Sequence, residues 1–420
     1  MEYTAFDSII GYQDIKQELL RLLDRLRDPE KYEKLGVTMP HGLLLHGAPG
    51  VGKSTFASCF VAASDMQAFT CRKDKPNGDF VKEITRIFEQ AAQAAPSIIL
   101  LDDMDKFANE DECHRDAEEF VTVQTCIDAV KNRQVFVIAT ANNLRKLPDS
   151  LIRAGRFDNV LKLNTPSGRD AEQIVAHYLA QRAYVGNLDT KSIARLLYGR
   201  SCAELETVIN EAGVYAGYDG HTQIEMGDVM KAILRVVFGA PLSTDVDRRP
   251  LPLIACHEAG HAVIAELLEP GSVDMVSVLS HGGEIGGITS LHQDEQYFYS
   301  QKRMENRVMC LLGGKAATEL CYGVTDTGTS SDLKRAFNIT LRFVDDYCAG
   351  GFDKFVFSPS PSEDLLSRRD QQVASEIARY YTRVKQMLVE NRGFLDGLIA
   401  KLVEEKTLLN EQIREVQRAA

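Results

Sequence analysis

The chain has 420 residues, of which 44% are hydrophobic and 26% charged, a mixture typical of folded, water-soluble proteins and not of disordered or fibrous ones. This length is enough for two or three domains, each able to bury its own core. The net charge of -12, without a clustered stripe of Lys and Arg, argues against a nucleic-acid partner.

Compartment is indicated by the cysteines and the amino terminus. Nine cysteines are scattered without a CxxC pair, which predicts reduced thiols and a cytoplasmic protein. The start, MEYTAFDSII, lacks the basic and apolar regions of a signal peptide. No stretch approaches the roughly 18 uncharged apolar residues of a spanning helix, so we expect no membrane segment in this chain.

Residues 42–160 alternate short β-branched runs with helical periodicity, as in GLLLHG, PSIILLDDMD and RQVFVIATANN. Strands that alternate with helices predict an α/β domain, a parallel sheet with flanking helices. Apolar residues then recur at spacings of three and four, which predicts a small helical domain. A connector, FGAPLSTDVDRRPLP, leads into a mainly helical third part. The expected domains are residues 1–162, 163–240 and 241–420.

The segment GAPGVGKS matches the phosphate-binding pattern GxxxxGK[ST] between a predicted strand and a predicted helix. Backbone N–H groups of such a loop turn toward phosphate oxygens, a lysine reaches the outer phosphates, and the final hydroxyl can ligate magnesium. A glycine-rich turn without a ligand is the alternative, which this placement disfavours. The predicted nucleotide-binding residues are Gly47, Ala48, Pro49, Gly50, Val51, Gly52, Lys53 and Ser54.

Further polar residues follow the next two predicted strands. Asp102 is placed to hold magnesium, Asp103 to activate the attacking water, and Asn142 to orient that water. Acidic residues after a strand are often only a solvated turn, but the phosphate loop upstream favours the functional interpretation. Arg153 and Arg156 either form surface ion pairs or stabilise phosphate charge in a neighbouring subunit.

The order of FDSIIGYQDIKQEL, GAPGVGKS, IILLDDMD, IATANN and LIRAGRFD resembles the AAA+ ATPases, most closely those of the FtsH-type ATP-dependent metalloproteases. The resemblance implies that Ile10 and Gly11 help enclose the adenine of ATP and that Asn142 is the polar sensor. It also implies that Arg153 and Arg156 act in trans within a homo-oligomeric ring, usually a hexamer.

The segment LPLIACHEAGHAVIAELLEP has helical periodicity between two prolines. Residues four apart share one face of a helix, so His257 and His261 can offer nitrogens to one zinc ion. Glu258 then faces the water that zinc polarises and can act as general base in peptide hydrolysis. A pair of histidines satisfied by other polar groups is the structural alternative.

A catalytic zinc needs a third protein ligand from outside this motif. In TDTGTSSDLKRAF, Asp332 stands where a turn leads into a predicted helix, so from the residues alone it is either a ligand or a helix cap. LPLIACHEAGHAV, LLGGKAATELCYG, TGTSSDLKRA and the closing VENRGFLDGLIAKLVEEKTLLNEQIREV resemble, in this order, the protease half of the FtsH type. This resemblance covers residues 4–415 and implies that Asp332 is the third zinc ligand.

The chain departs from the family pattern in three places. Family members normally begin with membrane-spanning helices, so this chain is either a relative without that anchor, which we expect, or a sequence from which the anchor has been removed. The water-activating carboxylate is usually glutamate, and Asp103 is one methylene shorter, which predicts slow ATP hydrolysis. The loop that threads substrate, CRKDKPNGDF, has Pro76-Asn77-Gly78 where the family has an aromatic triplet, and Phe80 is the one candidate substitute.

Together these observations predict an AAA+ α/β domain, a small helical domain and a mainly α-helical zinc protease domain. The predicted function is an ATP-dependent zinc endopeptidase for unfolded or loosely folded polypeptides, with zinc and with ATP and Mg²⁺ as cofactors. A non-proteolytic remodelling ATPase with a structural zinc, and a peptidase that nucleotide only regulates, stay open. We also expect GGEIGGITS to supply a strand edge that pairs with the substrate backbone.

Overall fold

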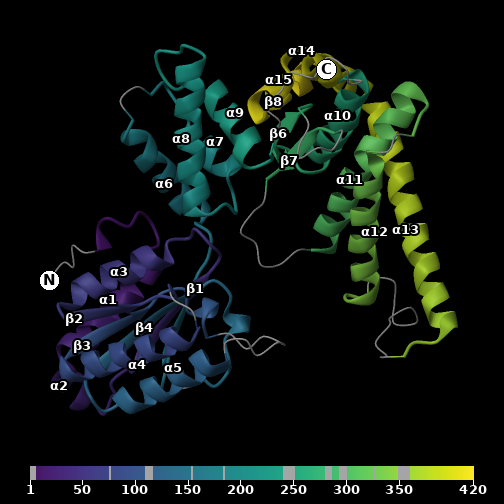
Figure 1. Ribbon diagram of the computed structural model, residues 1–420. Coiled ribbons are helices and arrows are strands. Elements are labelled where there is room, and N and C mark those ends of the chain that lie inside the picture. Colours follow the sequence, from purple (N-terminus) through teal and green to yellow (C-terminus); the bar gives the residue numbers. More distant parts are fainter. Residues whose placement is uncertain are drawn as a thin grey trace. The chain divides into compact units, whose positions relative to one another are not determined.

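The computed structural model describes residues 6–74, 77–108, 117–152, 155–182, 185–239, 251–279, 286–292, 300–325, 328–348 and 360–420. The chain divides into two compact units, Met1–Val229 and Met230–Ala420 (Figure 1). Each unit has a hydrophobic core of its own.

A five-stranded parallel sheet forms the centre of the first unit, in the order β2-β3-β4-β1-β5. The middle strands β3 and β4 are buried at every residue, and their near-continuous apolar runs are typical of strands covered on both faces. The prediction of an α/β domain is therefore confirmed. The strands are β1 (Gly42–Gly47), β2 (Gln67–Cys71), β3 (Ser97–Leu101), β4 (Val135–Ala141) and β5 (Asn159–Leu163).

Helices cover both faces of this sheet (Figure 1). Helices α1 (Gln13–Arg27) and α3 (Lys53–Ser64) pack together on one face. Helices α4 (Asn77–Gln93) and α5 (Ala117–Val130) pack together on the other. The short helix α2 (Pro29–Glu33) precedes β1. Because β1, β3 and β4 run parallel, the segments that leave their carboxyl ends meet at one edge of the sheet.

Four helices follow the sheet, as the three-and-four spacing predicted. They are α6 (Gly168–Ala180), α7 (Thr190–Leu196), α8 (Cys202–Tyr218) and α9 (Met226–Val236). The first three begin at Ser167, Asp189 and Ser201, whose side-chain oxygens accept a backbone N–H of the first turn.

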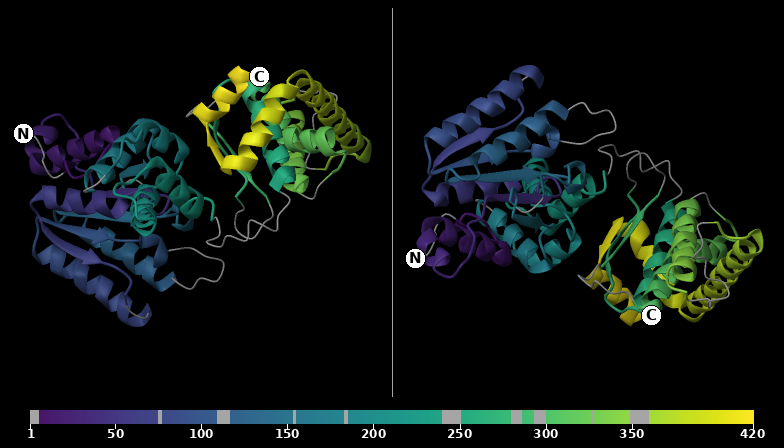
Figure 2. Two further views of the ribbon diagram at one scale, coloured as in Figure 1. Left: turned by 90° about the horizontal axis from the view of Figure 1, so that it is seen from above. Right: turned by 90° about the horizontal axis from the view of Figure 1, so that it is seen from below.

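The second unit is mainly helical, and Figure 2 shows its long helices α11, α12 and α13 side by side. A small antiparallel sheet in the order β7-β6-β8 accompanies them, with β7 at an edge. The end of the expected edge segment GGEIGGITS forms β7, and its place at the edge of the sheet is confirmed, whereas residues 282–285 lie outside the described residues and pairing with a substrate stays a prediction. Strands β6 and β8 were not predicted. The helices are α10 (Leu251–Leu268), α11 (Gln301–Tyr322), α12 (Thr329–Asp345), α13 (Glu363–Glu390), α14 (Arg392–Glu405) and α15 (Asn410–Ala419), and the strands are β6 (Val273–Ser277), β7 (Ile288–Leu291) and β8 (Thr407–Leu409).

Helix α10 is the core element of the second unit. Every residue from Ile254 to Glu266 is buried, as expected for a helix that is apolar on all sides. It approaches α11 closely, since a Cβ added at Gly260 would lie 2.4 Å from the carbonyl oxygen of Gly313. Side chains larger than hydrogen are therefore excluded at this crossing.

Among the described residues, α10 is also the one helix long and apolar enough to cross a membrane, with a mean hydropathy of 1.3. In this fold 67% of it is buried inside the unit, and buried core helices of soluble proteins pass the same test. The expectation that the chain has no membrane segment stays a prediction.

Candidate functional site

The predicted phosphate loop connects the end of β1 to the start of α3. Gly50 and Gly52 have φ of 76° and 94°, in the left-handed region that favours glycine. Gly52 is the N-cap of α3, and glycine has no side chain that could cap the helix. The N–H groups at the start of α3 are therefore left for an anion, and the helix dipole favours negative charge there.

Lys53 lies at the first position of α3 and is only 6% exposed. Its Nζ donates to the carbonyl oxygens of Gly47 at 3.0 Å and Ala48 at 2.8 Å, so the ammonium group is held against the loop. Burial lowers the pKa of Lys53, and the carboxylates of Asp103, Asp105 and Asp102 oppose this shift.

The two predicted magnesium ligands lie together at the carboxyl edge of the sheet. The hydroxyl of Ser54 donates to Asp102 Oδ1 at 3.0 Å, and the hydroxyl of Thr140 donates to the same oxygen at 2.8 Å. Thr140 in turn accepts the backbone N–H of Asp103 at 2.8 Å. Hydroxyl and carboxylate oxygens are the ligands that Mg²⁺ prefers. Sequence reasoning missed Thr140, although it stands two residues before Asn142.

Asp103 and Asn142 are also brought together, with Asn142 Nδ2 3.3 Å from Asp103 Oδ1. The other oxygen of Asp103 accepts a hydrogen bond from Lys106 Nζ at 2.6 Å. The bond from Lys106 is the main reason why the pKa of Asp103 is lowered. A carboxylate with a lowered pKa is a weaker base.

Asp105 positions Asn142 and was not singled out from the sequence. Its carboxylate accepts the backbone N–H groups of Asn142 at 3.1 Å and of Asn143 at 3.3 Å. Asp105 is buried, and a buried carboxylate needs such donors. The loop after β4 is therefore fixed to the segment after β3.

Of the two candidate trans-acting arginines, Arg153 lies outside the described residues. Arg156 forms a bidentate pair with Asp128 of α5, with Nε 3.0 Å from Oδ1 and Nη2 2.6 Å from Oδ2. This guanidinium holds the pKa of Asp128 down to about 2. In the single chain, Arg156 is thus bound to its own unit.

The expected adenine segment is attached to α6. Gly11 has φ of 72°, and a Cβ there would lie 2.6 Å from Asp170 Oδ1. The backbone N–H of Tyr12 donates to this oxygen at 3.1 Å, and the Tyr12 hydroxyl donates to the carbonyl of Asn164 at 2.9 Å. The backbone that carries Ile10 and Gly11 is therefore held in place by residues more than 150 positions away.

The threading loop falls partly outside the described residues, at 75–76. Phe80, the candidate substitute for the missing aromatic residue, is fully buried in α4. Its ring packs edge-on against Phe107, with ring centroids 5.1 Å apart. Phe80 is a core residue and is not exposed to grip a polypeptide.

The three predicted metal ligands converge, although 75 positions separate His257 from Asp332. Nε2 of His257 and Nε2 of His261 lie 3.0 Å apart. Asp332 Oδ2 lies 3.3 Å from the first nitrogen and 3.2 Å from the second. Ligands that bind zinc tetrahedrally with bonds of about 2.0 to 2.1 Å are roughly 3.3 Å apart, so the donor set fits zinc.

Asp332 does not cap its helix. Helix α12 begins at Thr329, and its N-cap is Gly328. Asp332 is the fourth residue of the helix, so its carboxylate can turn toward α10. The capping alternative is therefore wrong at this position.

Electrostatics around the three groups favour a positive charge. Burial alone would lower the pKa of His261, but the hydrogen bond and charge of Asp332 raise it to about 9. Burial alone would raise the pKa of Asp332, but the two imidazoles bring it well below its usual range. A divalent cation would supply the positive charge that the carboxylate draws toward the site.

Helix α11 orients His261. Nδ1 of His261 lies 2.7 Å from the carbonyl oxygen of Cys310 and donates to it, so Nε2 is the ring nitrogen that is turned toward His257 and Asp332. Two residues that sequence reasoning missed come from the same region: Cys310, through its backbone carbonyl, and Gly314. A Cβ at Gly314 would lie 2.6 Å from Nε2 of both histidines.

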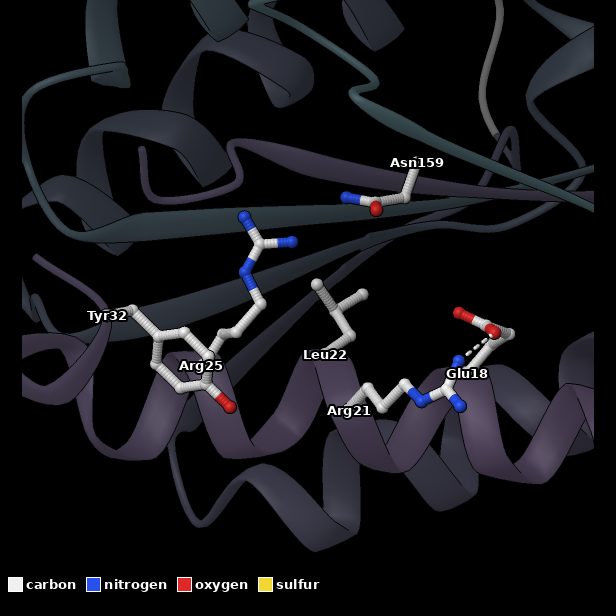
Figure 3. Close-up of a pocket in the computed structure, with 6 residues that line it drawn as sticks. All are labelled: Glu18, Arg21, Leu22, Arg25, Tyr32 and Asn159. Atoms are coloured by element: carbon white, nitrogen blue, oxygen red, sulfur yellow. Dashed lines mark hydrogen bonds and ion pairs between the residues drawn. The ribbon is translucent and has the colours of Figure 1, made fainter. Parts of the chain in front are cut away.

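The first unit also has a cavity of about 330 Å³ (Figure 3). It lies between α1, α2 and strand β5. Arg21 pairs with Glu18, and Arg25 donates to the carbonyl of Thr38, so both guanidinium groups are engaged. The predicted nucleotide and metal residues do not line it; its walls are Glu18, Arg21, Leu22, Arg25, Tyr32 and Asn159.

Comparison with known proteins identifies both halves. Residues 43–165 match the ATPase family associated with various cellular activities (AAA), and residues 245–416 match peptidase family M41. The fold and the site therefore define an AAA ATPase joined to a metallopeptidase. The chain belongs to the FtsH-type AAA+ zinc metalloproteases.

Relatives of nearly the full chain are proteins named ATP-dependent zinc metalloprotease FtsH. That of Pelobacter propionicus is 29% identical over 98% of this chain and 71% of its own length. That of Alkalihalophilus pseudofirmus is 29% identical over 97% of this chain and 65% of its own length. That of Bacillus subtilis is 28% identical over 97% and 69%. This chain thus spans about two thirds of such relatives.

Replacing Gly314 with alanine should damage the metal site. The added methyl would overlap the two imidazole nitrogens, so the rings must turn away from Asp332. We expect the affinity for zinc to fall by about 10- to 100-fold. The measurement is the zinc bound per chain, determined by atomic emission at a series of free zinc concentrations. Gly393→Ala in α14 is the matched control, because its Cβ would meet atoms no closer than 3.6 Å. Equal zinc affinity in the two variants would contradict the geometry described above.

Proposed function

We propose that this chain is an ATP-dependent zinc endopeptidase that degrades unfolded or loosely folded polypeptides. The observation that carries the proposal is the convergence of His257, His261 and Asp332 next to Glu258. The family membership supports it and disfavours a non-proteolytic ATPase or a peptidase that nucleotide only regulates.

In this proposal His257, His261 and Asp332 hold the zinc ion. Zinc bound there supplies a Lewis acid that lowers the pKa of a water molecule and polarises the peptide carbonyl. Glu258 accepts a proton from the water molecule, and the oxygen of that water attacks the carbonyl carbon of the substrate. The carbon–nitrogen bond then breaks, and Glu258 passes the proton to the leaving amine. No covalent enzyme intermediate is required.

Strand β7 is proposed to bind the substrate by pairing with its backbone. Its position at the edge of the sheet supports this, because an edge strand has one side of its backbone available for another strand. The contact of Thr289 in β7 with Glu258 supports it further, since it brings this edge next to the reacting groups.

In the ATPase half, the loop from Gly47 to Ser54 is proposed to bind ATP, with Ser54 and Asp102 on Mg²⁺. Asp103 and Asn142 act on the attacking water, and Ile10 and Gly11 lie against the adenine. The hydrogen bonds among Ser54, Asp102 and Thr140 support this assignment.

The assembly is proposed to be a homo-oligomeric ring, a hexamer, in which Arg153 and Arg156 stabilise phosphate charge in the neighbouring subunit. For this role Arg156 must leave Asp128 when the ring forms. The proposed domain division is 1–162, 163–240 and 241–420. The proposed location is cytoplasmic, which the free cysteines among the described residues support.

Glu258→Gln should abolish peptidase activity and keep zinc. The amide cannot take up a proton, and a general base contributes about 100- to 10,000-fold. The measurement is degradation of casein, an unstructured protein, with ATP, with a nonhydrolysable analogue and with a chelator. Glu404→Gln, on an exposed site of α14, is the control. Cleavage by the Glu258→Gln variant at the wild-type rate would sink the proposal.

Asp103→Glu should raise ATP turnover, by up to about a hundredfold, because the longer side chain brings the carboxylate closer to the attacking water. Steady-state phosphate release measures it. Asp364→Glu, whose side chain is 77% exposed in α13, tests for an effect of the substitution type alone. An unchanged or lower rate in the Asp103 variant would count against the geometric argument.

Ile288→Pro should reduce peptide cleavage while zinc content stays intact, because proline removes a backbone N–H and disrupts pairing at β7. The comparison is kcat/KM for a short peptide alongside metal content. Full activity in this variant would exclude β7 as the substrate edge.

A further inference from the structure

Thr289 is the residue of β7 that touches the proposed general base. Its hydroxyl oxygen lies 2.8 Å from Glu258 Oε2 and 3.1 Å from the backbone oxygen of Glu258. A hydroxyl has one proton, and the shorter contact, to the charged oxygen, is the stronger hydrogen bond. The carboxylate of Glu258 is therefore held by a donor from a different element.

The backbone just before β7 adds a second restraint on the same side chain. A Cβ at Gly287 would lie 2.5 Å from Cγ of Glu258, so the chain that enters the strand passes directly against the glutamate. Gly287 directly precedes β7, and Thr289 is the second residue of the strand. Together they confine Glu258 between the strand and helix α10.

Pairing within the sheet fixes where this contact falls. Thr289 pairs with Val276 of β6, and Ile288 pairs with Ser277. Thr289 stays in register because β6 itself is fully buried and paired with β8 on its other side. The hydroxyl is thus presented to Glu258 from a fixed position in the sheet.

We propose that Thr289 is a positioning residue that orients the Glu258 carboxylate and thereby couples the substrate-binding strand to the base. This inference rests on the proposed peptidase function. A peptide that pairs with β7 would lie in a register set by the same strand that orients the base. Strand β7 would then position both the backbone of the substrate and the Glu258 carboxylate that transfers the proton.

The test compares Thr289→Val, which keeps the shape and removes the hydroxyl, with Thr289→Ser, which keeps the hydroxyl. For an unstructured peptide we expect Thr289→Val to lower kcat by about 10- to 100-fold. KM should change less than about twofold, and zinc content should equal that of the wild type. Thr289→Ser should restore kcat to within about threefold. Thr382→Val in α13, where the hydroxyl bonds only to its own helix at Ala378, is the matched control.

Each other result overturns the inference. A raised KM with unchanged kcat would assign Thr289 to substrate binding alone. Loss of zinc in Thr289→Val would assign it to the integrity of the metal site, and failure of serine to rescue would assign it to packing of the methyl group. If the wild type cleaves and Glu258→Gln does not, while Thr289→Val is fully active, the inference fails and the proposed function stands. If the wild type cleaves nothing, the proposed function itself fails.

Discussion

The second unit depends on one constraint, the burial of two imidazoles and two carboxylates, those of Glu258 and Glu266, inside an otherwise apolar helix. An unpaired polar group in such surroundings costs on the order of a few kcal/mol, and an unpaired charge costs more. Helix α10 is buried on all sides, so each polar side chain must be satisfied by another element. Cys310 of α11 binds His261, Asp332 of α12 faces both histidines, and Thr289 of β7 binds Glu258. Helix α11, helix α12 and strand β7 thus provide the hydrogen-bond partners that the buried polar side chains of α10 require.

This arrangement depends on the close approach of helices α10 and α11. Glycines at 260 and 313 let α10 and α11 cross almost in backbone contact, and glycine at 314 leaves space for the two imidazoles. A carbonyl oxygen of α11 then comes within hydrogen-bond distance of a ring on α10. Helix packing and the geometry of the candidate metal site are therefore linked, because a side chain at Gly314 would also displace His257 and His261.

In the first unit the main requirement is different: three separate loops must lie side by side. Because the strands run parallel, their carboxyl ends lie at one edge of the sheet. The phosphate loop, the Asp102–Asp103 pair and Asn142 therefore meet there. Thr140 and Asp105 then link these loops by hydrogen bonds. In the same unit Asp103 is paired with Lys106, Arg156 is paired with Asp128, and Phe80 is buried in the core.

The sequence by itself determined most helices and strands and the two kinds of candidate site. The reason is that a phosphate loop and a helix with the HExxH spacing each need particular residues at fixed spacings along one continuous segment. The α/β sheet, the helices that follow it and the pairing of His257 with His261 follow from such local patterns. Only the tertiary structure excluded the cap for Asp332 and placed its carboxylate beside His257 and His261, and only it revealed Thr140, Gly314 and Thr289. Their roles depend on contacts between distant segments, and no local spacing encodes which buried group a hydroxyl or a missing Cβ will meet. Strands β6 and β8 were missed for the same reason, since short strands are stabilised by their partners and not by their own periodicity.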